Sequence, residues 1–284
     1  MDNEQAKQQV RQFYDRIGWQ EVREEQYQNA SYEDLRPVSS GYIRRCHLRV
    51  NRYLPRAGKY LLDGGSGPIQ YPEYLTYSKG HQFRVCVDIS IVAVQEARKR
   101  IGEHGLFIVA DVANLPFKPE SFDGIVSLHT LHHLEITDQR KAYLEFLRTM
   151  KHGSTSVVIN GWKESWLMKL AFPLVKLMER FIKGKNKPAV QPDHPIVNEP
   201  DTRIVEPGGT FVQKLSATSL KKMLAGYNLE IRCWRSVSVR FLRAVIHPFM
   251  LGSFLLWLLF HLENMFPHFF GVKGQYPIVI LHKS

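Results

Sequence analysis

The chain has 284 residues, of which 44% are hydrophobic, enough for one large domain or one domain with added segments. Its three cysteines, Cys46, Cys86 and Cys233, are scattered and form no CxxC or CxxH cluster. The sequence therefore predicts neither a metal site nor a disulfide framework, and it fits a reduced compartment. The net charge of +11 favours nucleic acid, an anionic membrane or an acidic ligand as partner.

The N-terminal segment is polar and helix-prone. Residues 1–5 lack an apolar core, so we expect no secretory signal there. Residues 3–17 carry apolar side chains at helical spacing, which predicts an amphipathic helix that Gly18 closes. Residues 20–40 are polar and loop-like.

A second helix is predicted over Tyr42–Leu54, which has apolar residues at helical spacing. Its basic residues are assigned to the polar face, and we expect Arg44 and Arg45 to be solvated or paired at the surface. The polar positions are Arg44, Arg45, His47, Arg49 and Arg52.

Residues 59–68, KYLLDGGSGP, read as a buried strand that breaks into a glycine turn. Leu61 and Leu62 supply the strand, and Asp63 ends it. The glycines permit positive φ and let the backbone approach a ligand closely. The turn consists of Gly64, Gly65, Ser66 and Gly67.

Three more strand-like runs follow, and each places a polar residue at its expected carboxyl end, where open α/β sheets bind ligands. In a nucleotide-binding unit, a carboxylate placed like Asp88 can accept hydrogen bonds from both hydroxyl groups of a ribose. The runs are FRVCVDIS (83–90), GLFIVADV (105–112) with NLPF after it, and SFDGIVSLHTLHHL (121–134).

In this order and spacing, DGGSG, VDIS, ADVANLPF and SFDGIVSLHTLHH resemble a class I S-adenosylmethionine-dependent methyltransferase. The group is the one with ubiquinone/menaquinone C-methyltransferase-like (methyltransferase type 11) signatures, and the resemblance covers roughly residues 40–165. It implies an α/β, Rossmann-like fold with a seven-stranded, mostly parallel sheet, helices on both faces, and S-adenosyl-L-methionine as cofactor. Ile69 departs from the pattern, because the family often has a third glycine at that place.

The resemblance also assigns the cofactor-binding residues, which follow the ends of the first four strands. They are Asp63, Gly64, Gly65, Ser66 and Gly67 around the methionine part and ribose, Asp88 on the ribose hydroxyls, Ile89 on adenine, Asp111 and Val112 at the adenine edge, and Leu128 and His129 near the sulfonium.

Methyl transfer is an in-line displacement at a sulfonium, so the enzyme mainly positions the reactants in a shielded site. An acceptor hydroxyl or enolisable carbon also needs a base. The candidates are His129, His132 and His133, because an unperturbed imidazole titrates near neutral pH. Tyr14 and Tyr71 are weaker candidates, and His132 and His133 have the alternative role of capping the loop.

Four further helices and three further strands complete the expected fold, with the last two strands adjacent and one of them antiparallel. The helices are 70–78 as the first crossover, 91–101 with Ser90 as N-cap, 138–150, and 218–224; the strands are 155–160, 229–236 and 276–282.

Residues 162–210 lie outside the minimal fold and are expected to be a helical insertion. Within 162–187, a Trp, Leu and Phe face is surrounded by basic residues, and the basic run 183–188 follows. This combination is typical of a helix on an anionic bilayer surface. The alternative is an ordinary helix packed on the sheet.

Residues 239–274 form the second expected insertion. Its segment 244–262 carries no formal charge and approaches the length of a transmembrane span. A single crossing would separate the two last strands, which must join one sheet. We therefore predict a helix or helical hairpin in the membrane interface, or an apolar lid over the substrate; a buried helix or dimer contact is the alternative.

Together these features predict one methyltransferase domain over 1–284, in which 1–40 form an N-terminal lid with Tyr14 and Trp19 facing cofactor or substrate. A helix that only caps the domain is the alternative for that segment. The expected acceptor is lipophilic (a quinone, isoprenoid or lipid-like molecule), met at the membrane surface by a cytoplasmic protein held on the inner face. Nucleic acid ranks lower, because it would not need the apolar segments. The rival functions are a soluble small-molecule O-methyltransferase and a non-catalytic membrane-associated scaffold.

Overall fold

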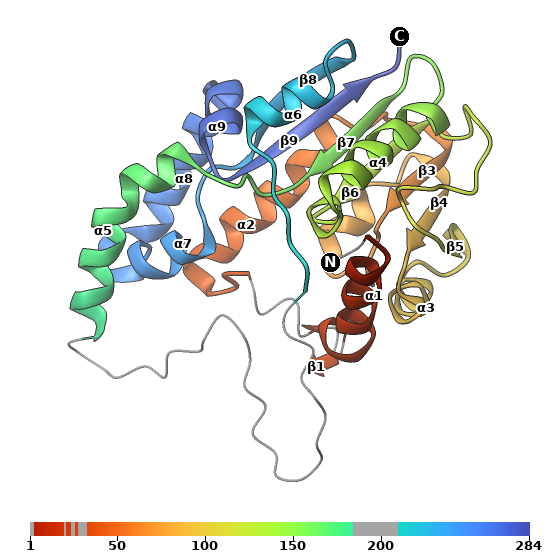
Figure 1. The fold of residues 1–284 in the computed structure, drawn as a ribbon. Coiled ribbons are helices and arrows are strands. Elements are labelled where there is room, and N and C mark those ends of the chain that lie inside the picture. The colour runs from red at the N-terminus through yellow and green to blue at the C-terminus, as the bar shows by residue number, and fades with distance from the viewer. Residues whose placement is uncertain (1–2, 20, 24–25, 28–32, 184–209) are drawn as a thin grey trace.

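The computed structural model describes residues 3–19, 21–23, 26–27, 33–183 and 210–284. Its centre is a seven-stranded sheet with the strand order β5-β4-β3-β6-β7-β9-β8 (Figure 1). Neighbouring strands from β5 to β7 are parallel, whereas β9 is antiparallel to both β7 and β8, so the expected antiparallel strand is confirmed. The strands are β3 (Gly58–Gly64), β4 (His81–Asp88), β5 (Gly105–Val109), β6 (Gly124–Leu128), β7 (Thr155–Ile159), β8 (Asn228–Arg235) and β9 (Tyr276–His282); β1 (Glu21–Arg23) and β2 (Gln26–Tyr27) form a separate pair.

Helices cover both faces of this sheet, and each face has its own hydrophobic core. Adjacent residues of a strand point to opposite faces, so Leu61 packs into one core and Leu62 into the other. The first core includes residues of α2 (Pro37–Arg49), η4 (Pro72–Thr76) and α3 (Ile91–Ile101), and the second includes residues of α4 (Ile136–Thr149) and α6 (Ala217–Met223). The α/β fold class is therefore as predicted.

The predicted crossover helix over 70–78 is wrong. The structure has only the short 3₁₀ segment η4 there, with Pro72 at its start. Proline lacks an N–H and disfavours a helical residue before it, and Tyr71 is accordingly extended, with φ −117° and ψ 143°, so no helix begins before Pro72. By contrast α3 has the predicted bounds, and its N-cap is Ser90, whose hydroxyl accepts a hydrogen bond from Ala93 N–H at 3.1 Å.

The second helix is shifted from its predicted position. Helix α2 begins at Pro37, inside the stretch expected to be a loop, and ends at Arg49, where the 3₁₀ turn η3 (Val50–Arg52) follows. Proline is favoured at the first position of a helix, which accounts for this start. Arg49 was assigned to the polar face, but it is buried.

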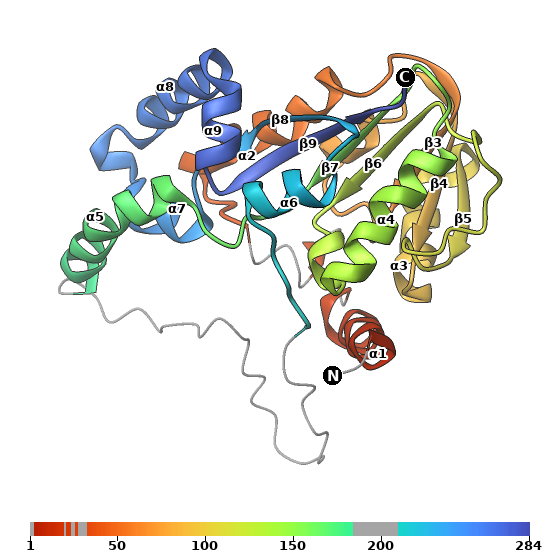
Figure 2. The same cartoon turned by 45° about the horizontal axis from the view of Figure 1, so that its top comes forward.

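The two insertions form a group of helices beyond the β8 edge of the sheet, away from α3 (Figures 1 and 2). They are α5 (Trp166–Lys183), α7 (Val239–Val245), η7 (Pro248–Met250), α8 (Gly252–Met265) and α9 (Pro267–Lys273). The first insertion beyond residue 183, with its basic run, lies outside the described residues. In the part of the chain that the structure describes, every helix is too short or too polar to cross a membrane.

A buried carboxylate joins the second insertion to the sheet. Glu263 of α8 is fully buried and accepts hydrogen bonds from Tyr42 Oη at 2.7 Å and from Arg49 Nη2 at 3.0 Å. It also accepts from the backbone N–H and the hydroxyl of Ser236, at 2.8 and 2.7 Å. One side chain therefore connects α8, α2 and the end of β8.

We predict that Glu263→Ala lowers the free energy of unfolding by about 3–5 kcal/mol, because it leaves the Arg49 guanidinium buried without its counter-charge. Urea denaturation followed by circular dichroism measures this loss. Glu179→Ala is the matched control, since it removes the ion pair with the exposed Arg240 and is expected to cost less than about 1 kcal/mol. Equal effects of the two substitutions would contradict the role assigned to Glu263.

Candidate functional site

A cavity of about 440 Å³ lies at the carboxyl ends of the strands. Its walls come from the ends of β3, β4 and β6, the residues after β5, helix α1 (Asn3–Phe13) with the π-helical turn η1 (Tyr14–Gly18), and the segments around Lys214 and Arg235. Nearly all predicted site residues line it: Tyr14, Asp63, Gly65, Ser66, Gly67, Asp88, Ile89, Asp111, Val112, Leu128, His129, His132 and His133. Gly64 does not, because it faces the core, where an added Cβ would lie 3.0 Å from the ring of Phe146.

The glycine turn has the backbone shape that its sequence requires. Gly65 and Gly67 have φ values of 71° and 55°, in the left-handed region that glycine favours. At Gly65, an added Cβ would lie 2.1 Å from the side chain of Thr130. Ile69 stands where the family often has glycine, yet it also has a positive φ, of 56°, and its side chain is fully buried. The turn therefore keeps its shape without that glycine.

Asp88 fixes the glycine turn against the end of β4. Its two carboxylate oxygens accept hydrogen bonds from the N–H groups of Gly67 and Ser90, both at 2.9 Å. Burial raises the pKa of Asp88 to about 6, although both backbone N–H groups oppose the rise. Since each oxygen has a second lone pair, the carboxylate can still accept hydrogen bonds from the hydroxyl groups of a ligand in the cavity.

Asp63 lies at the floor of the cavity in a buried ion pair that sequence reasoning missed. Its partner is Arg84 of β4, whose Nε donates to Oδ2 of Asp63 at 3.0 Å. The same guanidinium donates to the carbonyl of Tyr74 at 2.5 Å. An arginine inside an otherwise apolar strand was the available signal, because a buried cation needs a nearby carboxylate.

Helix α1 is attached to the edge of the cavity through Lys7. The Lys7 ammonium lies 2.6 Å from Asp111 and 2.7 Å from Asp138, and Asp111 also accepts from Ala113 N–H at 2.8 Å. Asp111, assigned to the adenine edge, therefore also holds the N-terminal segment. Nothing in the spacing of Lys7 indicated this contact.

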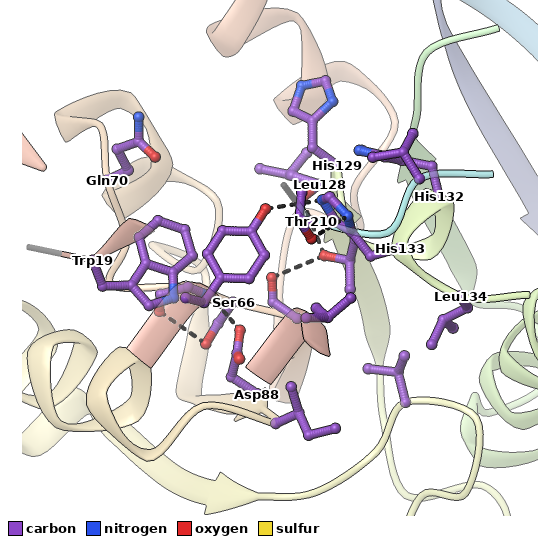
Figure 3. A pocket seen from close by; sticks show the side chains of 18 of the residues that line it. Trp19, Ser66, Gln70, Asp88, Leu128, His129, His132, His133, Leu134 and Thr210 are labelled. Atoms are coloured by element: carbon purple, nitrogen blue, oxygen red, sulfur yellow. Dashed lines mark hydrogen bonds between the residues drawn. The ribbon is translucent and has the colours of Figure 1, made fainter. Parts of the chain in front are cut away.

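The N-terminal aromatic residues lie over the turn and the histidines. Tyr14 and Trp19 are stacked with ring centroids 4.7 Å apart, and an added Cβ at Gly67 would lie 3.1 Å from the Trp19 ring. The Tyr14 hydroxyl lies 2.9 Å from Nε2 of His133. Figure 3 shows Trp19 beside Ser66, with Asp88 at the lower end of the labelled group and His129 at the upper end.

The three candidate bases differ in their hydrogen bonds. His133 donates from Nδ1 to the carbonyl of Phe211 at 2.8 Å, so its Nε2 accepts from Tyr14. His132 Nδ1 lies 3.1 Å from Oδ1 of Asn160. Because an amide oxygen only accepts, Nδ1 is the donor, and Nε2 of His132 is left as an acceptor. His129, with φ 55°, packs edge-on against the rings of Trp234 and Tyr276, at centroid distances of 5.0 and 5.7 Å.

Burial keeps these imidazoles neutral. It lowers the pKa of His129 to about 3, assisted by the nearby Arg235 cation, and the pKa of His133 to about 4. Burial also lowers the pKa of His132, with His133 and His129 adding to the effect. At neutral pH the three rings carry no charge, and a ring nitrogen without a proton can accept a hydrogen bond, but pKa values so far below neutral make the rings weak bases.

We predict that Asp88→Asn weakens the binding of S-adenosylhomocysteine by at least about tenfold. The amide group cannot accept from both Gly67 and Ser90, so one backbone donor loses its partner and the turn loses its support. Isothermal titration calorimetry measures the affinity. Glu96→Gln on α3, away from the cavity, is the control and should bind normally; equal affinity of Asp88→Asn and wild type would contradict the assignment.

Binding of S-adenosylhomocysteine should also depend on pH through Asp88. With a pKa of about 6, the carboxylate is ionised above that pH and becomes protonated below it. The ionised form accepts hydroxyl hydrogen bonds more strongly, so the affinity should fall as the pH decreases through about 6. Titrations between about pH 5 and pH 8 test this. Asp88→Asn should flatten the profile, and an unchanged profile would assign the effect to another group.

Known methyltransferases are similar to the part of the chain that lines most of the cavity. Residues 62–158 match the family described as "Methyltransferase domain". The chain is 30% identical over 138 residues to the human "Probable tRNA methyltransferase 9B", an alignment that spans 48% of this chain and 29% of that protein. The chain thus matches less than a third of the length of this curated relative.

Solved structures show the same fold at low sequence identity. A Thermotoga maritima protein described as a SAM-dependent methyltransferase and possible histamine N-methyltransferase superposes with a TM-score of 0.54, at 15% identity, over 97% of this chain and 100% of that one. Geranyl diphosphate C-methyltransferase from Streptomyces coelicolor, solved with S-adenosyl-L-homocysteine, gives 0.53 at 14% identity over 98% of both chains.

The matched residues 62–158 contain the glycine turn, and they contain Asp88, Asp111 and the three histidines, which line one cavity of about 440 Å³. The chain therefore contains a class I S-adenosylmethionine-dependent methyltransferase domain, an enzyme domain whose cofactor is S-adenosylmethionine.

Proposed function

We propose that the protein transfers a methyl group from S-adenosylmethionine to a lipophilic acceptor, a quinone, isoprenoid or lipid-like molecule, at a membrane surface. The observation that carries this proposal is a large apolar surface on the insertion helices. Within the proposal, the protein is cytoplasmic and binds the inner face of the membrane peripherally.

The apolar surface lies on α5 and on the segment from η7 to α9. Its most exposed residues include Phe249 at 79% and Leu251 at 71% exposure. Soluble monomers rarely expose so many large apolar side chains on neighbouring helices without a binding partner. We call this set the outer apolar surface: Trp166, Leu170, Phe172, Leu174, Leu177, Phe181, Phe249, Met250, Leu251, Phe254, Leu255, Trp257, Leu258, Met265, Phe266 and Phe269.

Positive charge accompanies the outer apolar surface. Lys176 and Arg180 are exposed on α5, and Arg240 and Arg243 lie on the adjacent α7. Apolar side chains flanked by cations suit an interface that contains anionic lipids, because each basic residue near such a surface adds about 1 kcal/mol of attraction.

The helices that carry the outer apolar surface follow directly in sequence after residues that line the cavity. Gly161, which precedes α5, and Val239, the first residue of α7, both line the cavity. Residues 244–262 contribute nothing to its described lining, so their exposed side is available for a membrane and does not close the pocket. Within the proposal, an acceptor enters from the lipid side of the insertion helices, beneath the N-terminal lid.

The roles of the lining residues follow from the same proposal. Asp88 holds the ribose, Asp111 meets the adenine edge, and the turn after β3 holds the methionine part. His129 and His132 are the proposed bases for an acceptor that loses a proton, since Nε2 of His133 is already engaged by Tyr14. Both imidazoles are neutral at physiological pH and can accept a hydrogen bond from the acceptor's hydroxyl, although their lowered pKa values make them weak bases in the absence of a substrate.

A second candidate acceptor is a tRNA. It is favoured by the likeness to a probable tRNA methyltransferase and by the net charge of +11, which suits a polyanion. We rank it second because the outer apolar surface has no evident use in binding RNA.

We predict that the protein floats with vesicles that contain anionic phosphatidylserine, and less so with neutral vesicles. The triple substitution Phe249→Ser, Phe254→Ser and Trp257→Ser should reduce vesicle binding by at least about tenfold, because it removes apolar side chains that would enter the interface. Density-gradient flotation measures the bound fraction.

The matched control is Leu106→Ser with Val109→Ser, two exposed apolar residues on β5 at the far edge of the sheet. This variant should float like wild type. Absence of flotation for wild type, together with methylation of unmodified tRNA, would replace the lipophilic acceptor by the tRNA; methylation of a water-soluble acceptor alone would favour the soluble O-methyltransferase.

A further inference from the structure

The cavity has a second charged region, away from the glycine turn. Lys214, Arg235, Tyr276 and His129 all line the cavity, and the ring of Tyr276 contacts both the Arg235 guanidinium and the ring of His129. His129 is assigned to the sulfonium region and to proton transfer, whereas Lys214, Arg235 and Tyr276 have no part in cofactor binding or proton transfer within the proposed function. We call Lys214, Arg235, Tyr276 and His129 the cationic end of the cavity.

Arg235 is almost completely buried, with only 2% of its surface exposed. Its guanidinium stacks over the ring of Tyr276, 4.6 Å from the centroid, and over Trp234 at 5.1 Å. Nη1 pairs with the carboxylate of Glu33, whereas Nε is buried and has no hydrogen-bond partner. A guanidinium that lines a cavity and keeps one N–H group, that of Nε, without an acceptor is suited to an oxygen ligand.

Lys214 lies near Tyr276 and Gly161 in the cavity wall. Its Nζ lies 3.5 Å from the position of an added Cβ at Gly161, and that position is 3.2 Å from Cε1 of Tyr276. Among the described residues, no carboxylate and no hydrogen-bond acceptor contacts the Lys214 ammonium. Burial alone lowers the pKa of this lysine.

The charges at this end do not cancel. Glu33 offsets Arg235 and the histidines are neutral, whereas Lys214 has no counter-charge among the residues that the structure describes. A bound S-adenosylmethionine adds a positive sulfonium to the same cavity. Because a partly buried cation is costly unless it is paired, the missing component of this site is an anion.

We propose that the cationic end binds an anionic oxygen group, a carboxylate or phosphate, at the head of the methyl acceptor. The proposal rests on the proposed function and narrows its substrate class to an acidic amphiphile. The anionic head pairs with Lys214 and Arg235, and the apolar body lies against Tyr71, Val212 and Val239, which line the same cavity. The head group thereby sets which atom of the acceptor faces the sulfonium.

The test compares four probes against the full chain saturated with S-adenosylhomocysteine: octyl phosphate, octanoate, 1-octanol and inorganic phosphate. Isothermal titration calorimetry should show at least one ionised amphiphile binding about tenfold or more tightly than 1-octanol, as expected for a charge-assisted hydrogen bond. Equal binding of 1-octanol would overturn the proposal. Inorganic phosphate binding as tightly as octyl phosphate would overturn the amphiphilic part and assign the site to a free anion.

Variants at position 214 supply the second measurement. Lys214→Met should abolish the preference for the ionised probes, Lys214→Arg should keep it, and Lys222→Met on the exposed side of α6 should leave it unchanged. An unchanged preference in Lys214→Met would contradict the proposal.

The cofactor's own carboxylate is the competing anion. If Lys214→Met loses affinity for S-adenosylhomocysteine as well, Lys214 belongs to the cofactor site and the acceptor proposal is overturned. Failure of the wild-type chain to bind S-adenosylhomocysteine contradicts the proposed function itself, and this outcome is therefore distinguishable from failure of the anion site.

Discussion

The carboxylate of Asp88 holds together the part of the molecule on which the site depends. By accepting hydrogen bonds from the N–H groups of Gly67 and Ser90, it joins the turn after β3 to the start of α3. Because Gly65 and Gly67 carry no Cβ, Thr130 and Trp19 can pack closely on the turn. At the glycine turn the cavity wall is therefore backbone, and one buried carboxylate holds that backbone in place.

Much of this arrangement follows from local sequence signals. The strands around the cavity are short apolar runs bounded by turn residues, and α3 begins at a serine that caps it, so these elements were predictable. The convergence of Asp63, Asp88, Asp111 and His129 followed from the rule that parallel strands present their carboxyl ends at one edge. The 3₁₀ segment η4 was not predicted, because the tyrosines in and beside it recur every three residues, a spacing that is also typical of one face of an α-helix.

Other features depended on partners far apart in the chain, which spacing cannot reveal. Arg49 meets Glu263 from a position 214 residues away, and Arg235 meets Glu33 across 202 residues. Each residue read singly looks like a surface charge, and only the fold shows that burial forces the pairing. Lys214 is the opposite case, a cation that lies in the cavity wall and has no ion-pair partner in the described part of the chain.

Ile69 links the cofactor turn to the interior. Its backbone has the left-handed conformation that a β-branched residue resists, while its side chain is fully enclosed in the core beneath α2 and α3. The loop conformation here is held by packing and not by intrinsic backbone preference. Loosening that core would let the loop relax, so distant changes that never touch the ligand should alter how well the loop is pre-shaped for it. We therefore expect thermal stability and ligand affinity to change together when the packing around Ile69 is altered.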